Sequence, residues 1–370
     1  MPPIQLLIKP ASGACNLRCK YCFYADIVSH WESKNFDMMS IETLDSILKQ
    51  AFILAENSIS IAFQGGEPTL IGLSFYQKYI ELINQYNSKN LIIQHAIQTN
   101  GILLNEEWAA FLAEHNFLVG LSIDGTRSNH DRYRVGPQNK GSFSEVWSKV
   151  ALLKKYNVKF NILTVVTADT AHHIRAIYPF YVSKRLIYQQ YIPCLNPLDE
   201  PDTRYEFSLT PDLYGDFLCD LFDMWFVDLR RGRFVYIQYF DNLVAMLKGL
   251  PPITCGMTGV CTPQLVVESD GSFYPCDFYV LDKYCLGNIQ TDTLAEIDAA
   301  RYNCAFLKES LPQALQCKTC PYFYICRGGC RRHREPLAAD HNGSMNYFCK
   351  SYKRFFDYSL ERLKYIAVRG

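Results

Sequence analysis

The segment Cys15-Asn-Leu-Arg-Cys19-Lys-Tyr21-Cys22-Phe-Tyr24 places three thiols at the spacing CxxxCxxC on one short loop. The apolar run at 6–8 precedes it and predicts a first buried strand. The thiols therefore follow the carboxyl end of a strand, where active sites gather in α/β proteins. They are one ligand short of a closed structural zinc site, and an iron–sulfur cluster with one open iron fits better. Three reduced thiols, or a zinc site completed from elsewhere in the chain, are the alternatives.

Composition bounds the class of protein. The 370 residues are 49% hydrophobic, which is enough for one large core or two moderate ones, and we expect about two domains. Lys and Arg number 37, as do Asp and Glu, so no net field attracts nucleic acid or a membrane surface. The amino-terminal apolar run is too short for a signal peptide, and no stretch approaches the ~20 residues of a membrane span. We expect a cytoplasmic protein, in which 15 cysteines argue for metal ligation over disulfides.

Strands and helices alternate through the first part of the chain. Short apolar runs predict strands at 6–8, 59–63, 92–97, 117–121, 160–166 and 188–192. Helical spacing predicts a helix that Ser40 caps and that ends near Asn57, followed by helices at about 73–86, 106–114, 144–156 and 173–182. This alternation predicts a parallel sheet with right-handed crossovers. Six strands are fewer than the eight of a closed barrel, so we predict an α/β fold with a partial (β/α)6 TIM-like barrel.

The pattern changes in the second part of the chain. Thr210 and Pro211 predict the start of a helix that runs to about Leu229, and another helix is predicted at 239–247. Cysteine density rises after residue 250, so we predict a barrel over 1–240, linker helices to about 250 and a small cysteine-rich α+β domain over 251–370. Within that domain the sequence at 269–271, Ser-Asp-Gly, predicts the turn of a β-hairpin. An amphipathic helix is predicted at about 346–366.

The carboxyl-terminal region holds enough cysteines for two complete sets of four. They are Cys255, Cys261, Cys276, Cys317, Cys320, Cys326, Cys330 and Cys349. A pair of four-cysteine zinc sites is the alternative to iron–sulfur clusters, because such zinc sites use similar ligand pairs. We interpret the remaining Cys194, Cys219, Cys285 and Cys304 as buried small hydrophobic residues. A basic cluster of Arg327, Arg331, Arg332 and Arg334 is expected to compensate anionic clusters and peptide carboxylates rather than to bind nucleic acid.

Three further short segments, which come after predicted strands or in the loops that follow them, contain candidate binding residues. The glycines of Gln64-Gly65-Gly66-Glu67-Pro68 let backbone groups approach a ligand closely. Ser122 and Asp124 lie at the end of the fourth strand, where a hydroxyl can reach a ribose, and capping of the next helix is the alternative. Arg134 can pair with a carboxylate through two hydrogen bonds, or it can be a surface arginine.

CxxxCxxC with an aromatic residue before its last cysteine resembles the signature of the radical S-adenosylmethionine enzymes. The resemblance implies that Cys15, Cys19 and Cys22 hold a [4Fe–4S] cluster whose open iron chelates the amino and carboxylate groups of the cofactor's methionine. It also implies that Gly65, Gly66 and Glu67 hold the amino group, as the GGEP motif does in that family. The residues that the resemblance places around S-adenosylmethionine are Tyr21, Gly66, Ser122, Arg134 and Leu195.

The later cysteines resemble the SPASM auxiliary cluster domain. In that family two [4Fe–4S] clusters are each held by four cysteines, which gives three clusters in all. The resemblance assigns one cluster to Cys255, Cys261, Cys276 and Cys330. It assigns the other to Cys317, Cys320, Cys326 and Cys349.

Longer runs, among them Phe63-Gln-Gly-Gly-Glu-Pro-Thr and Tyr274-Pro-Cys-Asp-Phe-Tyr, resemble anaerobic sulfatase-maturating enzymes over nearly the whole chain. Such enzymes convert a cysteine or serine of an unfolded sulfatase into formylglycine. The resemblance implies that Asp277 is the proton acceptor and that Tyr24, Gln64 and Gln98 line the substrate pocket. His333 stands where some relatives have a cysteine.

The resemblance also implies the partners of the chain. The substrate is expected to be an unfolded sulfatase with a CxPxR-type segment, and an electron donor such as flavodoxin or ferredoxin is expected to supply electrons. We expect a monomer. Because the same scaffold serves enzymes that form thioethers or other crosslinks in ribosomally synthesised peptides, a peptide maturase is the alternative function.

Overall fold

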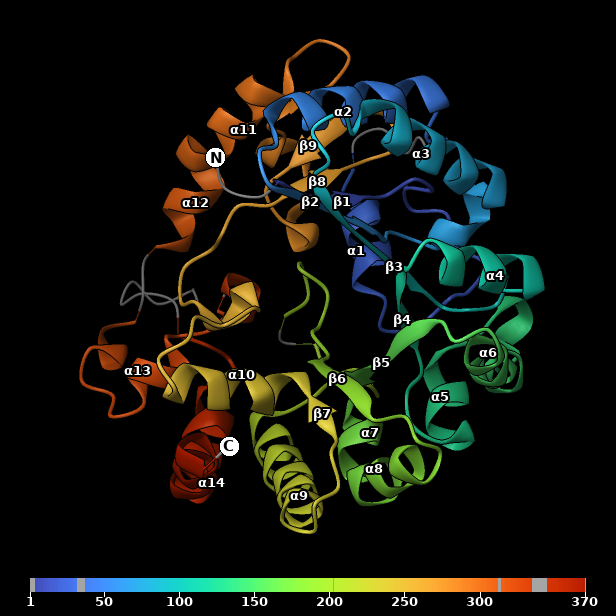
Figure 1. Ribbon diagram of the computed structural model, residues 1–370. Helices are drawn as coiled ribbons and strands as arrows, with labels where there is room; N and C mark the ends of the chain where they lie inside the picture. Colours follow the sequence, from blue (N-terminus) through green and yellow to red (C-terminus); the bar gives the residue numbers. More distant parts are fainter. Residues whose placement is uncertain (1–3, 32–36, 202, 312–313, 335–344, 370) are drawn as a thin grey trace. The chain divides into compact units, whose positions relative to one another are not determined.

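The chain forms two compact units in a computed structural model, which describes residues 4–31, 37–201, 203–311, 314–334 and 345–369 (Figure 1). Unit 1 comprises Met1–Ser122, Arg134–Phe160 and Pro263–Lys308. Unit 2 comprises Ile123–Tyr133, Asn161–Thr262 and Glu309–Gly370. Each unit is thus assembled from segments that lie far apart in the sequence.

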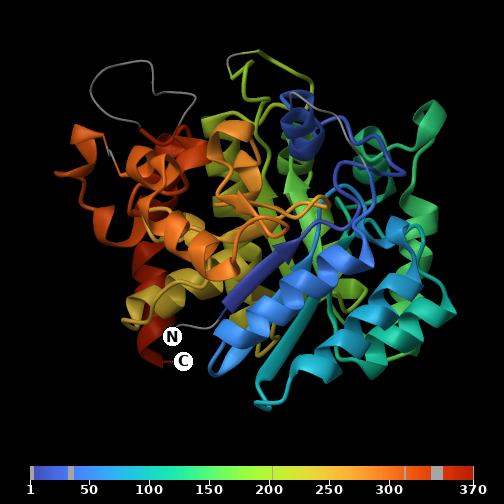
Figure 2. The same ribbon diagram turned by 90° about the horizontal axis from the view of Figure 1, so that it is seen from above.

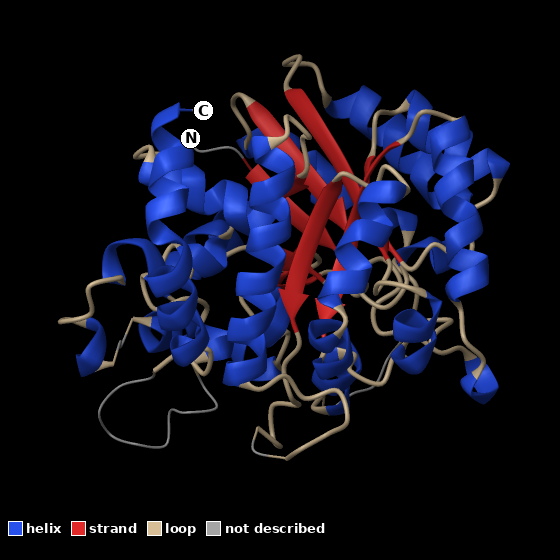
Figure 3. Cartoon of the chain, turned by 90° about the horizontal axis from the view of Figure 1, so that it is seen from below, coloured by secondary structure: helices blue, strands red, loops and turns tan. Residues whose placement is uncertain are grey.

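The sheet of unit 1 has the strand order β10-β9-β8-β1-β2-β3-β4. The first four predicted strands are present and run in parallel. They are β1 (Ile4–Ile8), β2 (Ser58–Phe63), β3 (Ile92–Thr99) and β4 (Leu118–Ser122). Figure 3 shows helices beside the strands, as expected when apolar strand residues are covered by crossover helices.

The predicted hairpin is present and extends this sheet. β8 (Leu265–Val267) and β9 (Ser272–Tyr274) are antiparallel, and Gly271 in their turn has φ 87°, which favours glycine. β10 (Gly287–Asn288) pairs with β9. β8 also pairs in parallel with β1, with Ile8 opposite Val267. The hairpin therefore belongs with the amino-terminal strands in unit 1, and the division into domains at about residue 250 stays a prediction.

Local capping explains where helices of unit 1 begin. The side chain of Ser40 accepts a hydrogen bond from the Thr43 amide at the start of α2 (Ile41–Leu54), as the sequence predicts. α2 and α3 (Leu73–Tyr86) contact each other, and Figures 1 and 2 show both alongside β1 and β2. The other helices are α1 (Phe23–Ser29), α4 (Glu106–Glu114), α6 (Phe143–Lys155) and α11 (Leu294–Asn303). Short 3-10 helices are η1 (Pro68–Ile71), η2 (Pro137–Asn139), η4 (Asp277–Tyr279) and η5 (Asp282–Tyr284).

Unit 2 carries the last two predicted strands, β5 (Lys159–Val166) and β6 (Tyr188–Pro193), which are parallel, and the short β7 (Tyr236–Ile237). Its helices are α5 (Arg127–Tyr133), α7 (Ala168–His172), α8 (Ile174–Ser183), α9 (Pro211–Arg230), α10 (Gln238–Leu247), α13 (Phe323–Cys326) and α14 (Cys349–Arg369), with η3 (Cys255–Met257), η6 (Leu315–Cys317) and η7 (Arg331–His333). α12 (Ala305–Ser310) spans the boundary between the ranges of the two units.

The predicted carboxyl-terminal helix is present as α14 and packs along α9 (Figure 1). Thr210 caps α9 by accepting a hydrogen bond from the Leu213 amide, as predicted. Lys350 of α14 lies 2.6 Å from Asp212, and Arg362 lies 2.8 Å from Asp223. Ion pairs thus join the two helices near their first turns and again in their interiors. Among the residues described, no helix is both long enough and apolar enough to cross a membrane.

Candidate active site

The three cysteines of the CxxxCxxC loop follow β1 in unit 1, and Cys22 stands at the amino-terminal cap of α1. Hydrogen-bond donors lie close to two of these sulfur atoms. The Cys15 Sγ accepts from the Leu17 amide at 3.4 Å, and Arg134 Nη1 lies 3.9 Å from the Cys19 Sγ. Burial raises the pKa of the Cys15 thiol to about 11, so metal coordination is what would hold it as a thiolate at neutral pH.

The GGEP motif is joined to this loop through its backbone. The Gly66 amide donates to the Ser12 carbonyl at 2.8 Å, and the Glu67 amide donates to the Ala14 carbonyl at 2.8 Å. A Cβ atom on Gly66 would lie 2.0 Å from the Ala14 oxygen, so no other residue type fits without a shift of the backbone. Because these two amides are committed to the cysteine loop, the motif offers a ligand its carbonyl oxygens, which suit an ammonium group.

The Glu67 carboxylate is buried and bonded within the protein. Its Oε1 accepts from the amide and hydroxyl of Thr69, at 3.1 and 2.6 Å, and from the Thr99 hydroxyl at 2.7 Å. Its Oε2 accepts from the Asn100 amide at 2.7 Å. Burial, the largest influence, raises the pKa of this carboxyl. The side chain thus ties the end of β2 to the end of β3, beside the cysteine loop.

The other predicted cofactor residues lie in both units. In unit 1, the Arg134 guanidinium is 5.7 Å from the centre of the Tyr21 ring, and Ser122 is buried at the end of β4. Leu195 follows β6 in unit 2. Asp124, also in unit 2, accepts a hydrogen bond from the Val165 amide at 2.9 Å. That carboxylate therefore bonds to β5.

Asp277 stands among buried polar side chains of unit 1. Gln64 Nε2 donates to Asp277 Oδ2 at 2.8 Å, and Lys9 Nζ lies 2.5 Å from Asp277 Oδ1. The Lys9 ammonium also lies 3.6 Å from the centre of the Tyr24 ring. Two of the three predicted substrate residues, Gln64 and Tyr24, are thus close to the predicted proton acceptor. Gln98 is half-buried in β3, opposite Gly120.

Lys9 and Glu268 belong to this cluster, although the sequence interpretation gave neither of them a role. β1 and β8 end side by side, with Ile8 opposite Val267, so the next residues of the two strands are neighbours. Glu268 accepts hydrogen bonds from Ser12 at 3.0 Å and from the Tyr24 hydroxyl. The sequence signal for a role of Lys9 was its place directly after a buried strand. Its partner Glu268 follows β8, which lies far from β1 in the sequence.

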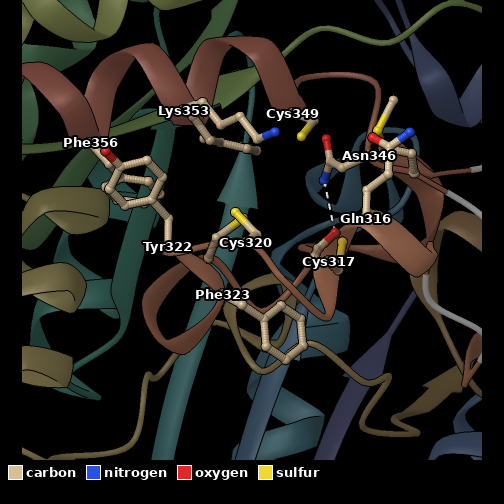
Figure 4. Close-up of a pocket in the computed structure, with 13 residues that line it drawn as sticks. Gln316, Cys317, Cys320, Tyr322, Phe323, Asn346, Cys349, Lys353 and Phe356 are labelled. Atoms are coloured by element: carbon tan, nitrogen blue, oxygen red, sulfur yellow. Dashed lines mark hydrogen bonds between the residues drawn. The ribbon is translucent and has the colours of Figure 1, made fainter.

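Four auxiliary cysteines surround one pocket of unit 2. Cys317, Cys320, Cys326 and Cys349 line it together with Lys353, and Figure 4 shows the sulfurs of the labelled cysteines turned toward the same space. Burial raises the pKa of the Cys326 thiol to about 11, and the pKa values of Cys317 and Cys349 are raised for the same reason. This grouping is the one that the resemblance to SPASM domains implies.

The second predicted set is divided between the units. Cys255, Cys261 and Cys330 lie in unit 2, where a Cβ on Gly256 would stand 3.5 Å from the Cys330 Cβ. Cys276 lies in unit 1, directly before Asp277. Within the described part of the chain, no three His, Cys, Asp or Glu residues converge on a single metal ion. A [4Fe–4S] cluster does not need such a point, because each thiolate binds a different iron.

Two interpretations of the remaining residues are refined. Of the four cysteines expected to be buried, Cys194 is buried, Cys219 and Cys304 are partly exposed and Cys285 is exposed, so the expectation is wrong for Cys285.

The basic cluster is mostly internal. Arg331 pairs with Glu309 at 2.8 Å, and Arg332 and Arg334 donate to backbone carbonyls of unit 2. These side chains stabilise the surroundings of the auxiliary cysteines.

Comparison with known proteins identifies the class of this chain. The sequence model of the radical SAM superfamily matches residues 10–180, and that of the SPASM iron–sulfur cluster-binding domain matches residues 255–321. The chain is therefore an enzyme of the radical SAM class with an auxiliary iron–sulfur domain, and its α/β fold with a partial barrel is confirmed.

Full-length relatives narrow the class. A cysteine-type anaerobic sulfatase-maturating enzyme of Clostridium novyi is 46% identical over 99% of this chain and 98% of its own. A serine-type enzyme of Bacteroides thetaiotaomicron is 35% identical over 96% of this chain and 89% of its own. The solved structure of native anSMEcpe with bound AdoMet and Cp18Cys peptide is 46% identical, covers 99% of both chains and has a TM-score of 0.93. The chain belongs to the anaerobic sulfatase-maturating enzymes.

Proposed function

We propose that this chain oxidises a cysteine in a CxPxR-type segment of an unfolded sulfatase to Cα-formylglycine. The observation that carries the proposal is the buried contact of Asp277 with Gln64 and Lys9, in the same compact unit as the CxxxCxxC loop. Preference for cysteine over serine is supported by the higher identity to the cysteine-type relative, 46% against 35%. Membership of this family favours the sulfatase substrate over a ribosomally synthesised peptide.

The chain's own residues would bind and orient the cofactors. Cys15, Cys19 and Cys22 would hold a [4Fe–4S] cluster with one open iron. For S-adenosylmethionine, the carbonyl oxygens of the GGEP motif would accept from the methionine ammonium. The other proposed contacts are Tyr21, Ser122, Arg134 and Leu195. Arg134 can donate hydrogen bonds to a carboxylate of the cofactor, because its guanidinium already lies beside Tyr21 and Cys19.

Two auxiliary [4Fe–4S] clusters complete the proposal. The pocket bounded by Cys317, Cys320, Cys326 and Cys349 fits one of them, because its thiols face a common space without converging on a point as zinc requires. Cys255, Cys261, Cys276 and Cys330 would hold the other. When bound, S-adenosylmethionine and the cluster with the open iron would supply the radical that removes a hydrogen atom from the substrate Cβ, and the auxiliary clusters would supply the acceptor for the remaining electron.

Asp277 would take the proton of the substrate thiol. Its carboxylate is mostly buried yet retains 15% side-chain exposure, so a substrate group can reach it. Gln64 donates a hydrogen bond to one of its oxygens, and the Lys9 ammonium pairs with the other by charge. A base held in this way transfers a proton more efficiently than a mobile one. We further propose a cytoplasmic monomer that receives electrons from a donor such as flavodoxin or ferredoxin. We also propose a barrel domain over residues 1–240 with linker helices to about 250, and a cluster domain with the carboxyl-terminal helix over 251–370.

The test is anaerobic incubation of the reconstituted enzyme with a CxPxR-type peptide, with mass spectrometry of the product. The wild type should yield the aldehyde, and Asp277→Asn should lower its rate by a factor of order 10² or more. Asp282→Asn, an exposed carboxylate in the same unit, is the matched control and should match the wild type. A crosslinked peptide without aldehyde would support a peptide maturase, and an Asp277→Asn rate near that of the wild type would remove Asp277 from the proposal.

A further inference from the structure

We propose that Asn100 is a positioning residue for the CxxxCxxC loop, and that its side-chain amide donates to the Cys15 sulfur and so makes a cluster held there easier to reduce. The inference rests on the proposed function only for the ligand role of Cys15. It does not depend on the sulfatase substrate or on Asp277. It starts from a buried polar side chain of unit 1 to which the sequence interpretation gave no role.

Asn100 is held in one orientation by its own turn. It directly follows β3, and only 7% of its surface is exposed. Its main-chain amide donates to Glu67 Oε2 at 2.7 Å, which ties the residue to the GGEP motif. Its side-chain oxygen accepts from the Ile102 amide at 3.0 Å, as in the turns that asparagine forms with the residue two positions on. Because that oxygen is committed to Ile102, the amide nitrogen Nδ2 is the atom that faces the cysteine loop.

Both N–H donors of this nitrogen have an acceptor in the loop. Nδ2 lies 2.7 Å from Asn16 Oδ1 and 3.8 Å from the Cys15 Sγ. A side-chain amide nitrogen carries two N–H groups, so each contact uses one of them. The contact with Asn16 joins the cysteine loop to the end of β3. The contact with Cys15 adds a side-chain donor to the main-chain donor of Leu17, whose nitrogen is 3.4 Å from the same sulfur.

A donor at this sulfur favours the reduced state of a bound cluster. Reduction takes one electron from the reductant and makes the cluster with its thiolates more negative. An N–H group that points at a ligand sulfur stabilises this added charge, and hydrogen bonds to the sulfurs are among the features that set the reduction potential. Because Asn100 is buried, water screens this interaction only weakly. Asn100 therefore raises the potential of the cluster that Cys15 holds.

Asn100 is the donor whose contribution can be measured separately. The Leu17 donor belongs to the main chain, so a change of side chain does not remove it. Arg134 Nη1 lies 3.9 Å from the Cys19 Sγ, but Arg134 is also a proposed contact of S-adenosylmethionine, and its replacement would change cofactor binding as well. Asn100→Leu keeps the branching of the side chain and removes its donors.

The experiment is a redox titration of the reconstituted full-length enzyme, followed by electron paramagnetic resonance with and without S-adenosylmethionine. The signal that changes when S-adenosylmethionine is added belongs to the cluster with the open iron, which separates it from the auxiliary clusters. The midpoint of this signal in Asn100→Leu should be more negative than in the wild type. At a fixed potential the reduced fraction should fall by roughly 3- to 10-fold, where tenfold corresponds to about 59 mV for one electron.

The choice of reductant separates this role from a merely misplaced loop. With dithionite, the initial rate of 5′-deoxyadenosine formation by Asn100→Leu should fall by roughly 3- to 10-fold. With titanium(III) citrate, a stronger reductant, the rate should return to near that of the wild type, because a more negative potential is the only defect.

Two further variants serve as controls. Asn16→Ala removes the loop contact but leaves the Asn100 donor beside Cys15, so its midpoint should equal that of the wild type or be more positive. Asn303→Leu, at an exposed position of α11 in the same unit, should match the wild type in every measurement. Iron content and circular dichroism are measured for all variants.

An unchanged or more positive midpoint in Asn100→Leu would overturn the inference, as would a midpoint in Asn16→Ala as negative as that in Asn100→Leu. If Asn100→Leu does not assemble its clusters, Asn100→Asp decides, because it keeps an acceptor for the Ile102 amide and replaces both donors by a carboxylate. Equal midpoints of Asn100→Asp and the wild type would reject the donor role. A wild type without a signal that responds to S-adenosylmethionine would mean that the proposed function has failed, whereas a normal wild-type signal with an unshifted Asn100→Leu would reject this inference alone.

Discussion

Gly66 and Ala14 approach so closely that a Cβ atom on Gly66 would stand 2.0 Å from the Ala14 carbonyl oxygen. Ala14 directly precedes the first cysteine of the CxxxCxxC loop, and the amide that follows Gly66 donates to the same carbonyl at 2.8 Å. The two motifs therefore share one backbone contact. Any displacement of the GGEP segment must also displace the loop that carries the thiols.

Gly66→Ala should consequently disturb the cysteine loop. The added methyl group has no space, so we expect a destabilisation of about 1–3 kcal/mol or more, with loss of S-adenosylmethionine cleavage. Denaturant unfolding and anaerobic deoxyadenosine assays measure the two effects. Gly136→Ala is the control, because a Cβ there meets its nearest atom at 3.7 Å. Normal cleavage by Gly66→Ala would show that the contact is not needed.

Replacing Cys15, Cys19 or Cys22 by alanine should abolish S-adenosylmethionine cleavage. Two thiolates are insufficient to assemble a cluster that leaves one iron open. Each variant should keep its fold, because the loop lies outside the strands. The measurements are deoxyadenosine formation and iron content after reconstitution, with circular dichroism as the check on folding. Retained deoxyadenosine formation in the triple variant would contradict the radical mechanism.

The sequence predicted several features that depend only on neighbouring residues. Ser40 and Thr210 cap their helices as predicted, because a cap needs only the amide three residues later. The six predicted strands were recognisable from short apolar runs. The helix α1 was not predicted, since its seven residues directly follow the last cysteine of the loop.

The Asp277 cluster could be predicted only in part. The resemblance to a known family identified Asp277, Gln64 and Tyr24. The ion pairs of Lys9, by contrast, depend on the pairing of β8 with β1. That pairing joins strands that lie far apart in the sequence, and no local pattern specifies which edge of the sheet a hairpin extends. The ion-pair partners of Lys9 could therefore not be identified from the sequence.

Cys317→Ala should lower the iron content and destabilise unit 2. The pocket that Cys317 shares with Cys320, Cys326 and Cys349 lies against α14, so cluster ligation would contribute to the folding of this region. Iron analysis and thermal unfolding under anaerobic conditions measure both effects. Cys219→Ala, a partly exposed cysteine of α9 in the same unit, should change neither. Unchanged iron in Cys317→Ala would refute the ligand assignment.

Glu67→Gln should destabilise the protein by about 1–3 kcal/mol, because one carboxylate oxygen that accepts a buried hydrogen bond is replaced by a donor. If the new amide group faces Asn100, two N–H donors oppose each other. Glu107→Gln, an exposed carboxylate of α4, is the control and should be neutral. Urea unfolding of the reconstituted enzymes measures the difference. Equal stability of the two variants would mean that the buried carboxylate is not required for folding.

His95 should make the stability of the enzyme fall with acidification. Its ring stacks on Phe117 with centres 5.0 Å apart, and Nδ1 lies 2.7 Å from the Tyr79 hydroxyl. Burial lowers the pKa of His95 to about 4, whereas an unfolded histidine has a pKa near 6.5. Between these values the unfolded chain binds a proton that the folded chain does not. Stability is therefore fully present above about pH 6.5 and is lost as the pH falls toward 4.

His95→Gln removes this titration, so its unfolding free energy should depend less steeply on pH than that of the wild type between about pH 7 and pH 5. Buried His333 also has a pKa lowered to about 4 and contributes to the slope of both proteins, so only the difference between them reports on His95. His172→Gln, at an exposed position of α7, should retain the wild-type slope. If His95→Gln and His172→Gln give the same slope, the His95 ring does not remain neutral in the folded state.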